Sequence, residues 1–112
     1  MYVSLNELKQ RITILRPVTE QDAEGNLVEH DRTEVATVWA KVLPYAAKIS
    51  DGYAEEVKEV DYRIAIRYRT DIKVTDIICW QGKTLRQTAP PYGKDGRRQW
   101  LILECRELVE DE

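Results

Sequence analysis

The sequence is poor in the residues on which catalysis most often depends. Its 112 residues include one histidine, His30, and two serines, Ser4 and Ser50. His30 stands in the polar string VEHDR just after a predicted turn, where a solvated side chain is expected rather than the base of a catalytic set. No carboxylate lies in the kind of apolar stretch that tunes an acid catalyst. We therefore predict that the protein is not an enzyme.

Signals for metal sites and disulfides are also missing. No CxxC or HxxxH spacing occurs, and the contiguous residues Glu29, His30 and Asp31 have side chains that diverge. The two cysteines, Cys79 and Cys105, are far apart in sequence and both lie in apolar runs. Such cysteines behave as small hydrophobic residues. We predict two free, mostly buried thiols and no metal or other cofactor.

Long apolar runs are absent as well. The longest contain three or four residues, which is too short to span a bilayer. The N-terminal string MYVSLNELKQ has neither the basic start nor the apolar segment of a secretory signal. The string GKDG lacks the strand–loop–helix context of a phosphate loop and is expected to be a turn. These absences predict no membrane association.

Period-two alternation, the pattern of a half-buried strand, runs through most of the chain. Its clearest example is DYRIAIRYR over 61–69, where Tyr62, Ile64 and Ile66 share one face. Arg63 and Arg67 share the opposite face with Arg69, so we expect one buried face and one basic ladder. Strands are predicted over 11–16, 27–43, 61–69, 76–80, 83–89 and 97–108, with hairpin turns at Gly25-Asn26 and Gln81-Gly82.

Trp39 lies in the strongest β segment of the first half, VATVWAKVL. A core position that closes a barrel is the favoured interpretation, and a subunit contact is the alternative. On other strands, Ile12 and Ile14 are expected to face the core, together with Leu101, Leu103 and Cys105.

One segment departs from the strand pattern. In 48–60, the apolar residues Ile49, Tyr53, Val57 and Val60 recur at helical spacing. The residues 45–61 are therefore predicted to form a helical or loop insert, and the acidic residues 107–112 a frayed tail. We predict one domain over 1–112 that is mainly β, a small antiparallel barrel or sandwich of about six strands with one short helical insert.

The charge is unevenly distributed although the whole chain carries only −3. Residues 62–106 have ten basic and four acidic groups, whereas residues 45–61 have two and five, and residues 107–112 have none and four. Opposite charges on different surfaces suit head-to-tail association of copies. Ordinary mixed surface charge is the alternative interpretation.

The order of these pieces resembles a known family. The strings are LNELKQRITILRP, the polar tip DAEGN, ATVWAKVLP, DYRIAIRYR, a hairpin turning at Gly82, and RRQWLILECRE. Together they cover roughly residues 5–108 and resemble the head closure, or head–tail joining, proteins of long-tailed bacteriophages and prophages, of the stopper type. The strand after Gly82, KTLRQT, lacks the aromatic residue expected there.

The resemblance implies a structural protein of the virion, made in the bacterial host cytoplasm. It would form a homo-oligomeric ring at the head–tail interface, below the portal and adaptor proteins, and bind a tail completion protein. Packaged DNA would pass through the channel without specific binding. The basic residues Arg63, Arg67 and Arg69 are candidates for the ring or partner interface. The candidate channel gate is the insert, with Ser50, Asp51, Tyr53, Glu55, Glu56 and Glu59.

A rival interpretation is a small β-barrel module that binds nucleic acid, of the oligonucleotide-binding or SH3-like kind. The arginines of the basic ladder favour it, as do Tyr62, Tyr68 and Trp80. Such modules carry aromatic residues and cations on the same exposed face. Alternation places Tyr62 and Tyr68 on the face opposite the arginines, which counts against this interpretation.

Overall fold

The structure is a computed structural model that describes residues 3–51 and 56–110, with the backbone alone described for 28–30, 46–51, 56–58 and 108–110. It confirms the prediction of a mainly β fold, and its two helical elements are single 3-10 turns. In chain order the elements are η1 (Leu5–Glu7), β1 (Gln10–Gln21), β2 (Leu27–Asp51), β3 (Glu56–Arg67), β4 (Ile77–Trp80), β5 (Lys83–Gln87), β6 (Tyr92–Gly93), η2 (Lys94–Gly96) and β7 (Trp100–Glu110).

The antiparallel strands close into a ring. The order around it is β3-β2-β1-β4-β5-β7, and β7 pairs with β3 to complete the circuit. The short strand β6 pairs with the first part of β7, on the edge where β5 pairs with the later part. Closure gives partners to strand edges that would otherwise be free to pair with other chains.

The core lies inside this ring and is built from alternate residues of each strand. Ile12 and Ile14 of β1 are fully buried, as are Ile64 and Ile66 of β3. The predicted inward faces of these strands are therefore confirmed. Burying one such side chain stabilises the fold by about 1.5–3 kcal/mol. The other buried members of this cluster are Ala40, Tyr62, Ile78, Leu85, Leu101, Leu103 and Cys105.

Both cysteines are free, as predicted. Cys105 lies in the core, and its burial, assisted by the neighbouring charge of Glu104, raises the pKa of the thiol to about 12. Cys79 is half-buried on β4. The fold does not depend on a disulfide, because the closed sheet already buries a continuous apolar core.

The turns have the backbone geometry that their sequences indicate. Gln81 and Gly82 connect β4 to β5, and both have positive φ, at 49° and 74°. Two consecutive positive φ angles are typical of the tight hairpin turn that matches strand twist. Gly93 in the GKDG turn is required for another reason: a Cβ there would lie 2.3 Å from the carbonyl oxygen of Arg97.

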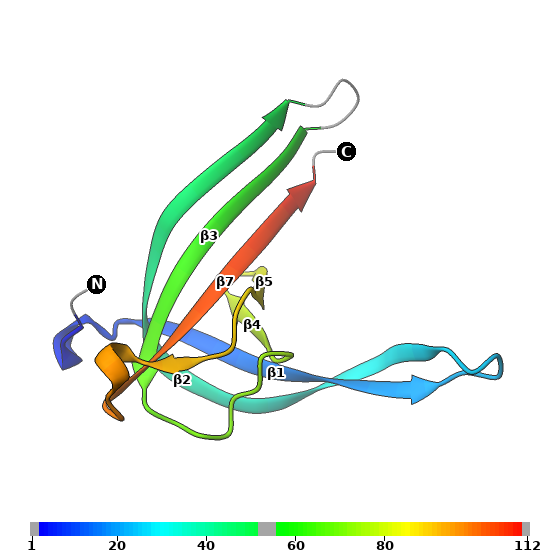
Figure 1. The fold of residues 1–112 in the computed structure, drawn as a ribbon, viewed down its shortest axis with the longest axis horizontal. Coiled ribbons are helices and arrows are strands. Elements are labelled where there is room, and N and C mark those ends of the chain that lie inside the picture. Colours follow the sequence, from blue (N-terminus) through cyan, green and yellow to red (C-terminus); the bar gives the residue numbers. More distant parts are fainter. Residues whose placement is uncertain (1–2, 52–55, 111–112) are drawn as a thin grey trace.

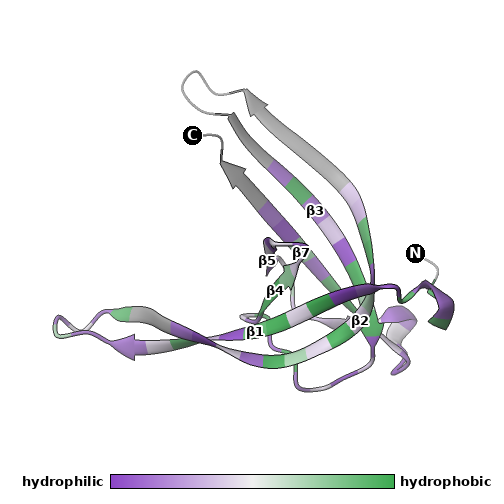
Figure 2. Cartoon of the chain, turned by 180° about the vertical axis from the view of Figure 1, so that it is seen from behind, coloured by the Kyte–Doolittle hydropathy of each residue, from purple (hydrophilic) through white to green (hydrophobic). Residues whose placement is uncertain are grey.

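Two projections leave the ring (Figure 1). The arm, residues 16–33, is the outer half of the β1–β2 hairpin, and its residues 18–27 are all exposed. The acidic extension combines residues 46–51 of β2, 56–61 of β3 and 106–110 of β7. Figure 2 shows hydrophobic residues concentrated where β1, β2 and β3 meet in the ring.

The arm is tied to the ring at its base by an ion pair. The Arg16 guanidinium donates hydrogen bonds of 2.9 and 3.0 Å to the carboxylate of Asp76, which is only 1% exposed. The same carboxylate accepts a hydrogen bond from the backbone N–H of Lys73, and Arg16 also reaches the carbonyl of Asp71. The buried carboxylate of Asp76 was not expected from the sequence.

The predicted helix over 48–60 is wrong. Residues 48–51 belong to β2 and residues 56–60 to β3, and the two segments pair in register from Ala46↔Asp61 to Asp51↔Glu56. Residues 107–110, predicted as part of a frayed tail, form the end of β7 and pair with 57–60. Pairing with neighbouring strands satisfies the backbone hydrogen bonds that a helix would have made internally. The β-branched residues of the segment favour this outcome.

Candidate functional site

The acidic extension brings together two segments that the sequence separates by about 50 residues. Strand β3 lies between β2 and β7 there (Figure 1). The segment predicted as an insert and the segment predicted as a tail therefore pair in one three-stranded sheet. By sequence, its described segments carry six carboxylates and three cations. The projection is thus a single acidic element rather than a helix with a separate tail.

The candidate gate residues divide according to their place in this element. Ser50, Asp51 and Glu56 lie in the paired strands, whereas Tyr53 and Glu55 lie outside the described residues. Glu59 is half-buried near the base of the extension, 3.9 Å from the guanidinium of Arg106.

Arg106 neutralises part of the acidic charge at that base. Its guanidinium donates hydrogen bonds of 2.7 and 3.3 Å to the carboxylate of Asp61, across the β3–β7 pair. The bond to Asp61 raises the pKa of Arg106. Cross-strand pairs of opposite charge stabilise a sheet modestly, so this contact holds β3 and β7 together where they leave the ring.

The three candidate interface arginines do not form a uniform basic ladder. Arg63 donates two hydrogen bonds, of 2.9 and 3.1 Å, to Glu104 on β7, and this contact raises its pKa. The Arg63 guanidinium also lies 4.7 Å from the ring centre of Tyr45. Arg69 is paired with Asp71 at 2.7 Å. Within the part of the chain that the structure describes, Arg67 is exposed and has no ion-pair partner.

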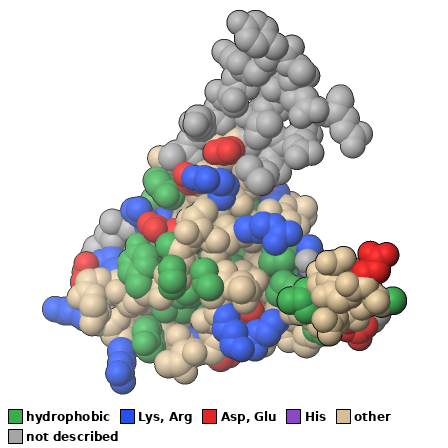
Figure 3. All heavy atoms as spheres, turned by 45° about the vertical axis from the view of Figure 1, so that its right-hand side comes forward, with side chains coloured by type: hydrophobic (Ala, Val, Ile, Leu, Met, Phe, Trp, Pro, Cys, Tyr) green, Lys and Arg blue, Asp and Glu red, His purple; other side chains and the backbone are tan. Residues whose placement is uncertain are grey.

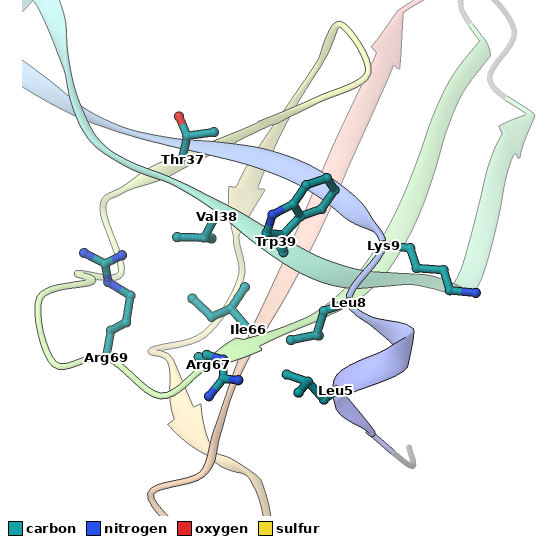
Figure 4. A pocket seen from close by; sticks show the side chains of 9 residues that line it. All are labelled: Leu5, Leu8, Lys9, Thr37, Val38, Trp39, Ile66, Arg67 and Arg69. Carbon is teal, nitrogen blue, oxygen red and sulfur yellow. The ribbon is translucent and has the colours of Figure 1, made fainter.

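Arg67 and Arg69 border an apolar groove that sequence reasoning did not find. It lies between η1, β2 and the end of β3 and has a volume of about 800 Å³. Figure 4 shows Leu5 and Leu8 facing Ile66 across it, with Trp39 on the β2 side. Val38, Thr37 and Lys9 complete its lining.

Trp39 is 52% exposed at this groove, so its predicted place in the core is wrong. The smaller residues Val38 and Ala40 face the ring interior instead, because alternation along β2 sends Trp39 outward. The guanidinium of Arg11 lies 4.8 Å from the Trp39 ring centre, a cation–π contact. The signal that the sequence offered was the alternation itself, which places Trp39 on the face opposite Val38 and Ala40.

The surroundings of the groove are basic. Glu7 is paired with Lys41, which lowers the pKa of the Glu7 carboxylate, and Asp71 is paired with Arg69. Residues 5–11, 37–41 and 66–71 together carry five cations and these two carboxylates. An apolar floor with a basic border is suited to an acidic, partly apolar partner segment.

Other kinds of site have little support in the described residues. No group of three or more metal-ligating side chains occurs among them. No helix in the same part of the chain has the length and apolar character needed to cross a membrane. Tyr62 is 5% exposed and packs edge-on against Trp80, with ring centres 5.4 Å apart. These two rings are therefore not an open platform on which nucleic-acid bases could stack.

One comparison with known proteins gives the family, and two solved structures have a similar fold. Residues 3–108 match the family model described as phage head completion protein. A chain from the structure of the virion of a native gene transfer agent particle superposes with a TM-score of 0.78 at 17% identity, covering 92% of this chain and 96% of that one. The solution structure of protein SF1141 from Shigella flexneri 2a gives a TM-score of 0.67 at 28% identity, covering 94% and 96%. No curated protein matches the sequence significantly.

Proposed function

Because this chain belongs to the phage head completion protein family, and is thereby a structural component of the virion, we propose that it forms a ring at the head–tail interface. The ring closes the filled capsid, retains the packaged DNA and offers a docking surface for the tail. Its partners are further copies of the chain, the portal and adaptor proteins above it, and a tail completion protein below it. The match over residues 3–108 is the observation that carries this proposal.

The acidic extension is the part of the chain suited to the channel. Its three paired strands continue from the ring and project away from the core. A carboxylate-rich surface repels the phosphate backbone, so DNA could pass along it without being bound. We assign the gate to this extension, and to its paired strands rather than to a helix.

The gate is tested by shortening the extension in register. Ile49 and Lys58 are paired, so residues 50–57 can be replaced by an Asn-Gly turn that keeps the remaining strands aligned. Phage particles carrying this variant should assemble the ring but lose DNA from filled heads. The thermal midpoint of the isolated protein should stay close to that of the unmodified chain. Normal DNA retention would contradict the gate assignment, and a large fall in the thermal midpoint would indicate a structural lid instead.

DNA binding tests the proposal against the nucleic-acid module. The net charge of −3 and the internal pairing of Arg63 and Arg69 predict weak or no binding of double-stranded DNA at physiological salt. Fluorescence anisotropy with a labelled duplex measures this directly. Tight, salt-sensitive binding that is lost in Arg67→Glu but kept in Arg98→Glu would favour the module, because both residues are exposed arginines.

A further inference from the structure

We propose that the arm of one copy docks into the apolar groove of the next copy and thereby links the subunits head to tail. The proposal rests on the ring of the proposed function and names the two surfaces that join. The occupant of the groove is a second copy of this chain, chosen for the charge, the apolar side chains and the position of the arm.

The arm has the composition that the groove requires. The arm contains five carboxylates, all within residues 17–31, and its two cations, Arg16 and Arg32, lie at its base. Two apolar side chains on it are exposed, Leu27 at 75% and Val18 at 38%. An exposed leucine among carboxylates at the end of a projecting hairpin adds nothing to the core of its own subunit. In a neighbouring groove it would meet Leu5, Leu8 and Trp39, with Arg67 at the border.

The end of the arm is held in one conformation before it binds. The Asp22 carboxylate accepts hydrogen bonds from the backbone N–H groups of Glu24 and Asn26, at 2.9 and 2.8 Å. Gly25 supplies the positive φ, 87°, that this turn needs. At the other end of the arm, Arg16 and the buried Asp76 fix its base to the ring. A segment ordered in advance loses little conformational entropy on docking.

The two surfaces lie at opposite ends of the molecule. Figure 1, drawn with the longest axis horizontal, places η1 at one side and the arm's end at the other. The molecule measures 45 Å along that axis. In Figure 3 the arm comes forward on the right as a separate lobe that carries red side chains. Different, complementary surfaces at opposite ends produce a head-to-tail contact, which closes into a ring when the rotation between copies permits.

The acidic extension is a poorer occupant of the groove. Near its base, Arg106 already pairs with Asp61 and lies within 3.9 Å of Glu59. Its described strands also mix two lysines with the carboxylates, whereas the arm has its two cations, Arg16 and Arg32, at its base and only acidic charge, apart from His30, over residues 17–31. Charge complementarity with the basic border of the groove therefore favours the arm.

Disulfide crosslinking in assembled phage particles tests the docking. A double variant, Leu27→Cys with Thr37→Cys, places one thiol on the arm and one beside the groove. Both positions lie on β2, ten residues apart, which is about 33 Å along a strand and far beyond disulfide reach within one copy. Oxidation should yield a ladder of dimers, trimers and larger species. Each single variant, and Leu27→Cys with Gln99→Cys, should yield no ladder above background.

A charge reversal at Arg67 tests whether the basic border of the groove contributes to docking. In the double-cysteine background, Arg67→Glu should reduce the crosslinked fraction about tenfold, because it opposes like charges at each subunit contact. Glu20→Arg on the arm is the compensating change, because it places a cation opposite the carboxylate that Arg67→Glu introduces, and it should restore part of the crosslinked ladder. Asp22→Arg is not suitable, because the Asp22 carboxylate accepts the hydrogen bonds of the turn. Arg98→Glu, an exposed arginine outside the groove lining, should leave the ladder unchanged.

The possible results distinguish failure of the arm–groove docking from failure of the proposed ring function. Particles that contain the double-cysteine chain but give no ladder overturn the docking, while the ring proposal stands. A ladder that is unaffected by Arg67→Glu also overturns it, because the groove border would then play no part. Particles that assemble normally without incorporating the unmodified chain overturn the proposed function instead.

Discussion

The ring and its two projections are made from the same strands, yet they use opposite side-chain chemistry. On β1, Ile12 and Ile14 are fully buried in the ring, whereas residues 18–21 of the arm are all exposed. On β2, Ala40 is fully buried and Leu27 is 75% exposed. The stability of the protein therefore resides in the ring, and its contacts with other molecules are expected from the projections and the groove. Substitutions in the two regions should have different consequences.

The largest effect on stability is expected in the ring core. Ile64→Ala removes a fully buried side chain from the centre of β3 and should lower the free energy of unfolding by about 2–5 kcal/mol. Leu27→Ala, on the arm, should change it by less than about 0.5 kcal/mol. Urea denaturation followed by circular dichroism measures both. A Leu27→Ala variant as unstable as Ile64→Ala would show that the arm belongs to the cooperative core.

A pH effect of intermediate size is expected from the buried thiol of Cys105. Its pKa is about 12 in the folded protein against an ordinary value of 9.0, so the unfolded chain loses this proton first as the pH rises. The stabilisation is fully present below pH 9 and is lost between pH 9 and 12, by about 1.4 kcal/mol per pH unit from this group. Unfolding curves at pH 8, 9 and 10 measure the slope.

The control for this slope is Cys105→Ala. It should be less stable at every pH because it leaves a small cavity, but its stability should fall less steeply above pH 9. Equal slopes in the two proteins would contradict the assignment to Cys105. Thiol labelling gives a second measurement, in which buried Cys105 should react more slowly than half-buried Cys79 in the native protein.

The smallest effect is expected from the Arg63–Glu104 pair on the outer face of the ring. Both side chains are partly exposed, at 33% and 23%, so solvent screens their attraction. A double-mutant cycle with Arg63→Met and Glu104→Gln should give a coupling energy of about 0.2–1 kcal/mol. A coupling well above that range would place this surface pair among the main determinants of stability. A coupling of zero would mean that the pair orients Arg63 without stabilising the fold.

The alternation of the sequence was sufficient to predict much of the ring. It identified the inward faces of β1, β3 and β7 and the turn at Gln81-Gly82, because a strand sends successive side chains to opposite faces and a tight turn needs particular backbone angles. It also placed Tyr62 on the face opposite Arg63, which the structure confirms. These are local properties, and local sequence determines them.

The tertiary structure alone decided the rest. The segment 48–60 has helical spacing, yet it forms strands because β2 and β7 provide backbone partners on both sides of β3. The pairing of Arg63 with Glu104, 41 residues apart, depends on the register between β3 and β7. The groove depends on the tertiary structure, because Leu5 of η1, Trp39 of β2 and Arg67 at the end of β3 are distant in sequence and line it together. Register and closure are set by the simultaneous burial of all the inward faces, a condition that no single segment of the sequence contains.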